Sequence, residues 1–369
     1  MPRVKETTLE LDLEALEHNY NYIRTKIHPS TMFLAVVKAF AYGSDSVIIA
    51  KKLEELGVDY IAVAYAHEGK VLREAGIKTP ILVLHAQPSN YAMVIKYCLE
   101  PSLYSPRVLR EFIKASKAEK QKAYPVHIKF NTGLNRLGFW ENDISNIAGQ
   151  LEGRDELKIK SIFSHLAASE DTSEEEFSQN QIKSFEKIAE EFTSKLKIRP
   201  FMHILNTSGI FNYPEAQFQM VRSGIGLYGY GNEARYDAKL RPVATLKTII
   251  SQIHKIEPNE SVGYNRAFTA EGTKKTATLP LGHADGIGRQ YGNGKASVLV
   301  NGMEAPIIGN VCMDMIMIDV TGIECKEGDQ VIVFGKAHSA ENFAAGGNTI
   351  SYELLSDISQ RVKRVITGA

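Results

Sequence analysis

Lys38 is the residue from which the chemistry of this sequence can be inferred. It follows the apolar residues 33–37 (FLAVV), which predict a strand buried on both faces. Lysine is seldom buried without a partner. At the carboxyl end of a buried strand, desolvation favours the neutral, nucleophilic amine that condenses with an aldehyde. Lys38 is therefore a candidate Schiff-base lysine, although a lysine whose ammonium group reaches water would have the same local sequence.

Other predicted strand ends also carry polar residues. Lys129 and His165 end two of them, and the segments 206–209 (NTSG) and 222–224 (RSG) follow the last two predicted strands. Small hydroxyl residues and glycines let backbone N–H groups approach a phosphate closely. A lysine together with a phosphate-binding loop indicates pyridoxal 5'-phosphate (PLP). Taken singly, each glycine loop is equally well explained as an ordinary strand-to-helix turn.

The elements that must position these groups alternate between strand and helix patterns. Eight buried-strand patterns occur at 33–39, 60–66, 80–86, 101–104, 124–131, 158–166, 201–208 and 220–224. Helical patterns separate most of them, so we predict an α/β fold in which residues 1–235 form a (β/α)8 TIM-type barrel. An open doubly wound sheet is the alternative that the same alternation allows.

The pattern changes after about residue 235. Short β-type runs separated by Gly, Asn and Asp predict a β-rich carboxy-terminal domain, residues 236–369, which closes on a helical pattern at 352–365. Residues 8–12 alternate like a short strand, and Asp12 is a plausible N-cap for the helix that follows. Residues 1–11 are candidates for pairing with the carboxy-terminal domain.

Composition narrows the function classes. Lys plus Arg and Asp plus Glu both number 43 in 369 residues, so no charge excess points to nucleic acid or to a membrane surface. Three scattered cysteines and ten histidines without ligand spacing predict no disulfide framework and no metal site. The amino terminus lacks the apolar region of a signal peptide, and no apolar run approaches about 18 residues. We therefore expect a soluble, cytoplasmic protein.

The segment 224–229 (GIGLYG) matches the G-x-G-x-x-G pattern of dinucleotide-binding proteins. It lies on the last strand–helix connection of the predicted barrel rather than at the start of a βαβ unit. We therefore do not expect it to bind NAD.

Seven segments together resemble the alanine racemase family, in the family's order and over nearly the whole chain. They are 35–43 (AVVKAFAYG), 129–138 (KFNTGLNRLG), 222–229 (RSGIGLYG), 261–266 (SVGYNR), 281–286 (LGHADG), 309–314 (GNVCMD) and 352–355 (YELL). The resemblance implies a PLP-dependent racemase that interconverts L-alanine and D-alanine through an external aldimine and supplies D-alanine for peptidoglycan.

The resemblance also implies two catalytic bases. Lys38 would bind PLP and serve as the base for D-alanine, and Tyr264 would be the base for L-alanine. Two bases suit a racemase, which needs a proton donor–acceptor on each face of a planar carbanion. In the family this tyrosine comes from the partner subunit, so a homodimer with shared active sites is implied.

The remaining roles are also implied by the resemblance. Arg222 would face the pyridine nitrogen with His165 behind it, and Lys129 matches a position that is often carbamylated. The substrate carboxylate would be bound by Arg136 and the backbone of Met313. The phosphate would be held by Tyr42, Thr207, Gly224, Ile225 and Tyr352.

Four positions depart from the family's usual residues. Phe40 and Asn131 replace aspartates, His283 replaces a tyrosine and Met315 replaces a glutamine. Asn131 makes carbamylation of Lys129 an open question, and His283 and Met315 bear on substrate access.

Three alternative functions stay open at this point. One methylene-sized group changes specificity by only about 1–3 kcal/mol, so serine or another small amino acid is an alternative substrate. A PLP-dependent decarboxylase would carry an acidic residue where Arg222 stands. A non-catalytic PLP-binding protein would need neither Tyr264 nor a second domain.

Overall fold

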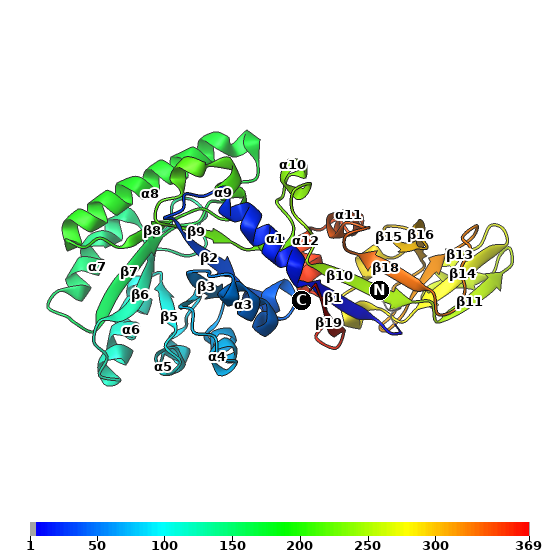
Figure 1. Cartoon of the computed structure of the whole chain (residues 1–369), viewed down its shortest axis with the longest axis horizontal. Helices are drawn as coiled ribbons and strands as arrows, with labels where there is room; N and C mark the ends of the chain where they lie inside the picture. Colours follow the sequence, from blue (N-terminus) through cyan, green and yellow to red (C-terminus); the bar gives the residue numbers. More distant parts are fainter. Residues whose placement is uncertain (1–4, 369) are drawn as a thin grey trace. The chain divides into compact units, whose positions relative to one another are not determined.

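The computed structural model describes residues 5–368 and contains two compact units (Figure 1). One comprises residues 17–39 and 46–240, and the other comprises the remaining described residues. None of the described helices has the length and apolar character needed to cross a membrane.

The first unit is a nearly closed barrel of eight parallel strands. The first seven strands pair in chain order, and the eighth pairs with the first. Backbone bonds from Gln219 to Met202 and from Arg222 to Leu205 bring the seventh and eighth strands together. The strands are β2 (Met32–Val36), β3 (Tyr60–Val63), β4 (Ile81–Val83), β5 (Glu100–Leu103), β6 (Tyr124–Lys129), β7 (Leu157–Phe163), β8 (Phe201–His203) and β9 (Met220–Ser223).

The predicted (β/α)8 barrel is therefore confirmed, and the open doubly wound sheet is wrong. Most strands end several residues earlier than predicted, because the polar strand ends belong to loops and helices. Sequence patterns did not reveal α7 or α9. The helices that accompany the strands are α1 (Leu13–Arg24), α3 (Ser46–Glu55), α4 (Ala66–Glu74), α5 (Tyr91–Lys96), α6 (Pro106–Ala118), α7 (Ile144–Leu151), α8 (Glu175–Leu196), α9 (Thr207–Asn212) and α10 (Ala234–Asp237).

The chain leaves β2 through an unusual turn. Helix α2 (Lys38–Tyr42) has φ between 52° and 55° at residues 39–42, so it is left-handed, and Gly43 continues it at φ 75°. A left-handed conformation costs about 1–2 kcal/mol per residue that has a Cβ. The prediction of a strand through residue 39 was wrong here. Specific contacts must stabilise this turn.

The second unit is built on a nine-stranded sheet in the order β11-β14-β17-β16-β15-β18-β10-β1-β19. The amino-terminal strand β1 pairs with β10 and β19, and Asp12 caps α1 by accepting from the N–H of Ala15 at 2.9 Å. The sheet strands are β1 (Thr8–Asp12), β10 (Ala244–Ile249), β11 (Gln252–Ile256), β14 (Lys274–Leu279), β15 (Ser297–Val300), β16 (Met303–Ile308), β17 (Ile316–Asp319), β18 (Gln330–Phe334) and β19 (Lys363–Thr367). A separate two-stranded sheet joins β12 (Ser261–Val262) and β13 (Phe268–Thr269).

Two expectations for this unit were wrong. The run 243–256 forms two strands, because β10 pairs with β1 and β18 whereas β11 pairs with β14. The helical close at 352–365 is only the short helix α12 (Ser351–Ser356), preceded by α11 (Ala340–Gly346). Beyond it the chain becomes β19, since its β-branched residues pair in parallel with β1.

Candidate active site

Four cationic side chains act on one another at the carboxyl ends of the barrel strands. Burial lowers the pKa of Lys38, the nearby Arg136 lowers it further, and Glu68 opposes the shift. Burial also lowers the pKa of Lys129 to about 8, with added effects of Arg136 and Arg222. The charges that act on Lys129 are all positive. The barrel mouth therefore favours neutral amines and attracts anions.

Arg222 is a buried member of this cluster. One terminal nitrogen donates to Nδ1 of His203 at 2.8 Å, and the other donates to Nδ1 of His165 at 2.9 Å. The second nitrogen also donates to the carbonyl oxygens of Ser164 and Ile204. Burial lowers the pKa of Arg222 to about 9, which leaves the guanidinium charged at neutral pH.

The two histidines beside Arg222 are neutral acceptors. Burial, followed by the charge of Arg222, holds the pKa of both His165 and His203 well below the usual range. No described residue accepts a hydrogen bond from Nε of Arg222 or from the second hydrogen of Nη1. A buried guanidinium with donors to spare fits the unprotonated pyridine nitrogen of PLP, which accepts one hydrogen bond.

The loops after β8 and β9 are tied together by Thr207. Its Oγ1 accepts from the backbone N–H of Gly224 at 3.2 Å and of Gly226 at 3.3 Å. A Cβ on Gly226 would lie 2.6 Å from Cγ2 of Thr207, so a side chain would force the two loops apart. Thr207 and Ile225 each begin a short helix, whose first backbone N–H groups have no acceptor within the helix. This arrangement fits a phosphate group.

The second unit carries the two tyrosines assigned to the phosphate. The rings of Tyr42 and Tyr352 lie 6.1 Å apart. Burial, and next the neighbouring Tyr352, raises the pKa of Tyr42, so its hydroxyl stays protonated and can donate.

Arg364 secures the left-handed turn that contains Tyr42. Its guanidinium donates to the carbonyl oxygens of Gly43 at 2.7 Å and of Ser44 at 3.0 Å. It also donates to three carbonyls near its own strand, those of Ile358, Ser359 and Val362. Arginine has five N–H donors, and five carbonyl oxygens accept from this one.

Phe40 also contacts the guanidinium of Arg364. The guanidinium carbon of Arg364 lies 5.6 Å from the centre of the Phe40 ring, which is cation–π geometry. At residue 40, where aspartate was the expected residue, this chain thus presents an aromatic ring to the guanidinium. Sequence reasoning missed Arg364, because the turn that it holds at Gly43 and Ser44 lies about 320 residues away along the chain.

Tyr264 and Met313 line one pocket of the second unit. Tyr264 begins a 3-10 turn after Gly263, whose φ of 74° favours glycine, and Asn310 donates to its carbonyl oxygen. Tyr264 is 68% exposed and Met313 is 59% exposed. The pocket is lined by Gly263, Tyr264, Thr278, Cys312, Met313, Asp314, Met315 and Met317.

The loop that carries Met313 is fixed through its carbonyl groups. The N–H of His283 donates to Cys312, and that of Ala284 donates to Met313, each at 3.0 Å. Arg361 adds ion pairs to Asp285 and Asp314 at 2.7 Å each. No described residue accepts from the N–H of Met313, which suits the predicted contact with a substrate carboxylate.

Asn131 bonds within its own loop. Its oxygen accepts from the backbone N–H of Gly133 and Asn135, and its nitrogen donates to the side chain of Asn135. Among the described residues, the side-chain amide of Asn131 therefore bonds only within its own loop. The charges that act on Lys129 are those of Arg136, Arg222 and Lys38.

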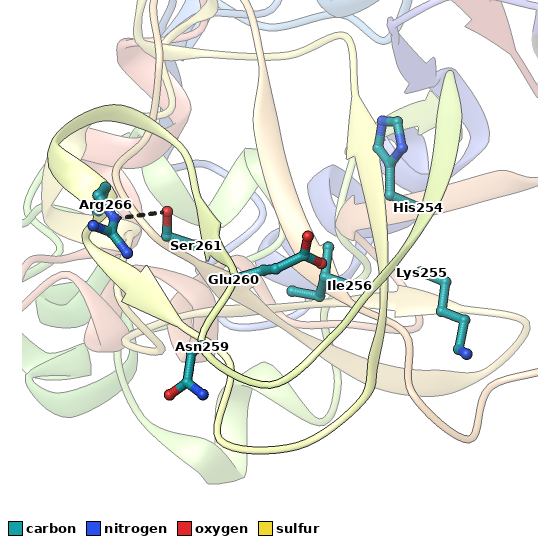
Figure 2. A pocket seen from close by; sticks show the side chains of 7 residues that line it. All are labelled: His254, Lys255, Ile256, Asn259, Glu260, Ser261 and Arg266. Carbon is teal, nitrogen blue, oxygen red and sulfur yellow. Dashed lines mark hydrogen bonds between the residues drawn. The ribbon is translucent and has the colours of Figure 1, made fainter.

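Another pocket in the second unit contains none of the predicted site residues (Figure 2). It lies beside β11 and β12, and within it Arg266 donates to Ser261 at 3.1 Å. The residues that line it are His254, Lys255, Ile256, Asn259, Glu260, Ser261 and Arg266. In the part of the chain that the structure describes, no three His, Cys, Asp or Glu side chains group as a metal site.

Comparison with known proteins identifies the family. Residues 11–232 match the model of the alanine racemase amino-terminal domain, and residues 243–366 match that of the carboxy-terminal domain. An alanine racemase from Thermodesulfovibrio yellowstonii is 39% identical over 363 residues, which is 96% of each chain.

Solved structures agree with this result. Alanine racemase from Clostridium difficile has a TM-score of 0.92 and 32% identity, covering 100% of this chain and 97% of that one. The Bartonella henselae enzyme, described with covalently bound pyridoxal phosphate, has a TM-score of 0.89 and 28% identity, covering 98% and 99%. The chain therefore belongs to the alanine racemase family of PLP-dependent enzymes.

Proposed function

We propose that this protein interconverts L-alanine and D-alanine, with Lys38 and Tyr264 as the two bases. The observation that carries the proposal is the lowered pKa of Lys38 at the barrel mouth. In the same mouth an arginine, Arg222, donates to the two histidines, where a decarboxylase would carry an acidic residue. A neutral lysine amine can both hold the PLP aldehyde and accept a proton.

PLP, when bound, supplies the electron sink that makes the α-proton of an amino acid acidic. Arg222 donates a hydrogen bond toward the pyridine nitrogen, and its positive charge disfavours protonation of that nitrogen. With PLP bound, Arg222 would thereby limit charge build-up in the ring and favour return of the proton to the α-carbon. Thr207, Gly224 and Ile225 of the barrel would hold the phosphate, and Tyr42 and Tyr352 of the second unit are the tyrosines that would donate to it.

The substrate carboxylate is bound by Arg136 and the N–H of Met313 in this proposal. Lys129 is carbamylated, which turns a cation into an anion beside Arg136. Two observations support the carbamate: the pKa of Lys129 is about 8, so a far larger neutral fraction than in an ordinary lysine is available to react with CO2, and its charged neighbours are all cations.

We further propose that the enzyme is a cytoplasmic homodimer that supplies D-alanine for peptidoglycan. The large exposure of Tyr264 and Met313 supports the homodimer, since exposed apolar groups around a catalytic residue are suited to cover by another subunit. In the dimer, Tyr264 of one subunit acts on the cofactor held by Lys38 of the other.

The test is racemisation measured with a panel of L-amino acids and added PLP. Alanine should be the preferred substrate, with serine the main competitor, and no CO2 should be released. Turnover of none of the panel, or decarboxylation of any, would contradict the proposal.

The shared site is tested with mixed dimers of Lys38→Ala and Tyr264→Phe chains. One intact site per mixed dimer should restore activity that neither parent has. Verified heterodimers that stay inactive would place both bases in one subunit.

A further inference from the structure

Five neighbouring barrel strands each contribute one polar residue to a continuous hydrogen-bond chain. They are Glu100 on β5, His127 on β6, Ser161 on β7, His203 on β8 and Arg222 on β9. The links measure 2.8 Å between Glu100 and His127, 2.6 Å between His127 and Ser161, 2.9 Å between Ser161 and His203, and 2.8 Å between His203 and Arg222. Only the Arg222 end has a role in the proposed reaction.

When His127 carries a single proton and Glu100 is ionised, the two ends of the chain determine the direction of every bond. A guanidinium can only donate, so Nδ1 of His203 accepts and its proton is on Nε2. That proton is donated to Ser161, whose hydroxyl donates in turn to Nδ1 of His127. The remaining proton of His127 is on Nε2 and is donated to the Glu100 carboxylate, which as an ionised group can only accept.

The middle of the chain is sealed from water. The side chains of His127, Ser161 and His203 are completely buried, and that of Glu100 is 12% exposed. Glu100 also interacts with the hydroxyl of Tyr60, and Arg73 is a further charge near it. Reversing the direction of one hydrogen bond would leave a buried donor or acceptor without a partner. The burial of these groups therefore favours the one set of bond directions described above.

We propose that Glu100 is a positioning residue for Arg222: through His127, Ser161 and His203 it fixes the tautomer of His203 and thereby the orientation of the guanidinium. This proposal rests on the assigned role of Arg222 at the pyridine nitrogen. The carboxylate at one end and the cation at the other make the chain a remote counter-charge for Arg222, which has histidines and carbonyls but no carboxylate as direct partners.

Ser161→Ala cuts the chain in the middle and leaves both end pairs in place. Ser102→Ala is the matched control, because Ser102 is an equally buried barrel serine on β5 whose hydroxyl has no hydrogen-bond partner among the described residues. Glu100→Gln is a second, nearly isosteric variant, which keeps an acceptor for His127 but removes the charge and adds a donor.

The first readout is 15N NMR of histidine-labelled protein without cofactor. His127 and His203 should both carry their proton on Nε2 near neutral pH. Glu100→Gln should change the ring-nitrogen shifts of His203, and in the Ser161→Ala background the same substitution should no longer change them. A doubly protonated His127, or a His203 that responds to Glu100→Gln equally in both backgrounds or in neither, would overturn the proposal.

The second readout is the steady-state kinetics of the PLP-loaded enzyme. In Ser161→Ala, kcat should fall about tenfold while KM for alanine changes less than about twofold, the scale of one lost hydrogen bond in a chain that ends on a charged group. Ser102→Ala should match the wild type. Equal kinetics of the two serine variants would overturn the coupling to Arg222. A wild type without racemase activity would contradict the proposed function instead. The NMR result alone would then test whether the hydrogen-bond chain links Glu100 to His203.

Discussion

The barrel mouth and the Tyr264 pocket place their functional groups in opposite surroundings. Lys129 and Arg222 are buried, and hydrogen bonds within the barrel fix Arg222. Tyr264, Met313 and Met315 project from the second unit with about half or more of their surface exposed. The difference teaches that the barrel alone organises the surroundings of Arg222, whereas the proposed second base, Tyr264, is presented on the surface of the second unit. Substitutions in the two regions should therefore fail in different ways.

The largest effect is expected at the barrel mouth. Lys38→Ala removes both the covalent attachment and one base, so racemisation should fall by more than about 10⁴-fold. Borohydride reduction of the wild type should leave PLP on the peptide that contains Lys38. PLP on the peptide that contains Lys129 would show that Lys38 is not the attachment site, and it would contradict the role assigned to the barrel mouth.

Tyr264→Phe tests the exposed region. The variant keeps the ring and loses the ionisable hydroxyl, so it should retain PLP and lose about 10²–10⁴-fold in racemisation. Exchange of the α-proton from D-alanine should survive better than exchange from L-alanine, since Lys38 is intact. Tyr97→Phe, which removes only an exposed bond to Glu74, is the control. Equal loss of both exchanges would contradict a one-sided role.

Arg364→Lys tests how much Arg364 stabilises the left-handed turn of the second unit. A lysine cannot span five carbonyls, so the free energy of unfolding should fall by about 3 kcal/mol. Urea denaturation of the cofactor-free protein measures this. Arg110→Lys, a change on the exposed face of α6, should alter stability by less than about 0.5 kcal/mol. A similar small change for both variants would show that Arg364 does not stabilise the turn.

The smallest effect concerns the buried charge of Lys129. Its folded pKa of about 8 lies below the unfolded value, so the unfolded chain binds more protons between about pH 8 and pH 10.5. The destabilisation is therefore complete below pH 8 and fades as the pH rises to 10.5. In CO2-free buffer, Lys129→Met should be more stable than the wild type by about 2 kcal/mol at pH 7 and equal to it near pH 10.5.

Lys122→Met is the control for this measurement, because Lys122 is exposed and its replacement should show no such pH dependence. An advantage of Lys129→Met that stays constant with pH would mean that the lysine is not held in a charge-disfavouring site.

The sequence by itself determined the succession of barrel strands and the chemical groups at their ends. Runs such as 33–36 and 60–63 are apolar on both faces, and this local pattern is enough to predict buried parallel strands. Lys38 and Arg222 were predicted as site residues from their places at strand ends. The roles of Arg136 and of the three tyrosines were predicted only through the resemblance to the alanine racemase family.

Only the tertiary structure decided the features that depend on partners far apart in the chain. The left-handed turn at 39–42 opposes local preference and is stabilised by Arg364, about 320 residues later. Residues 363–367 carry apolar spacing that also fits a helix, but pairing with β1 makes them a strand. The chain from Glu100 to Arg222 exists because the barrel places five strands side by side. In each case the free energy comes from contacts that no local pattern contains, which is why the sequence alone could not reveal them.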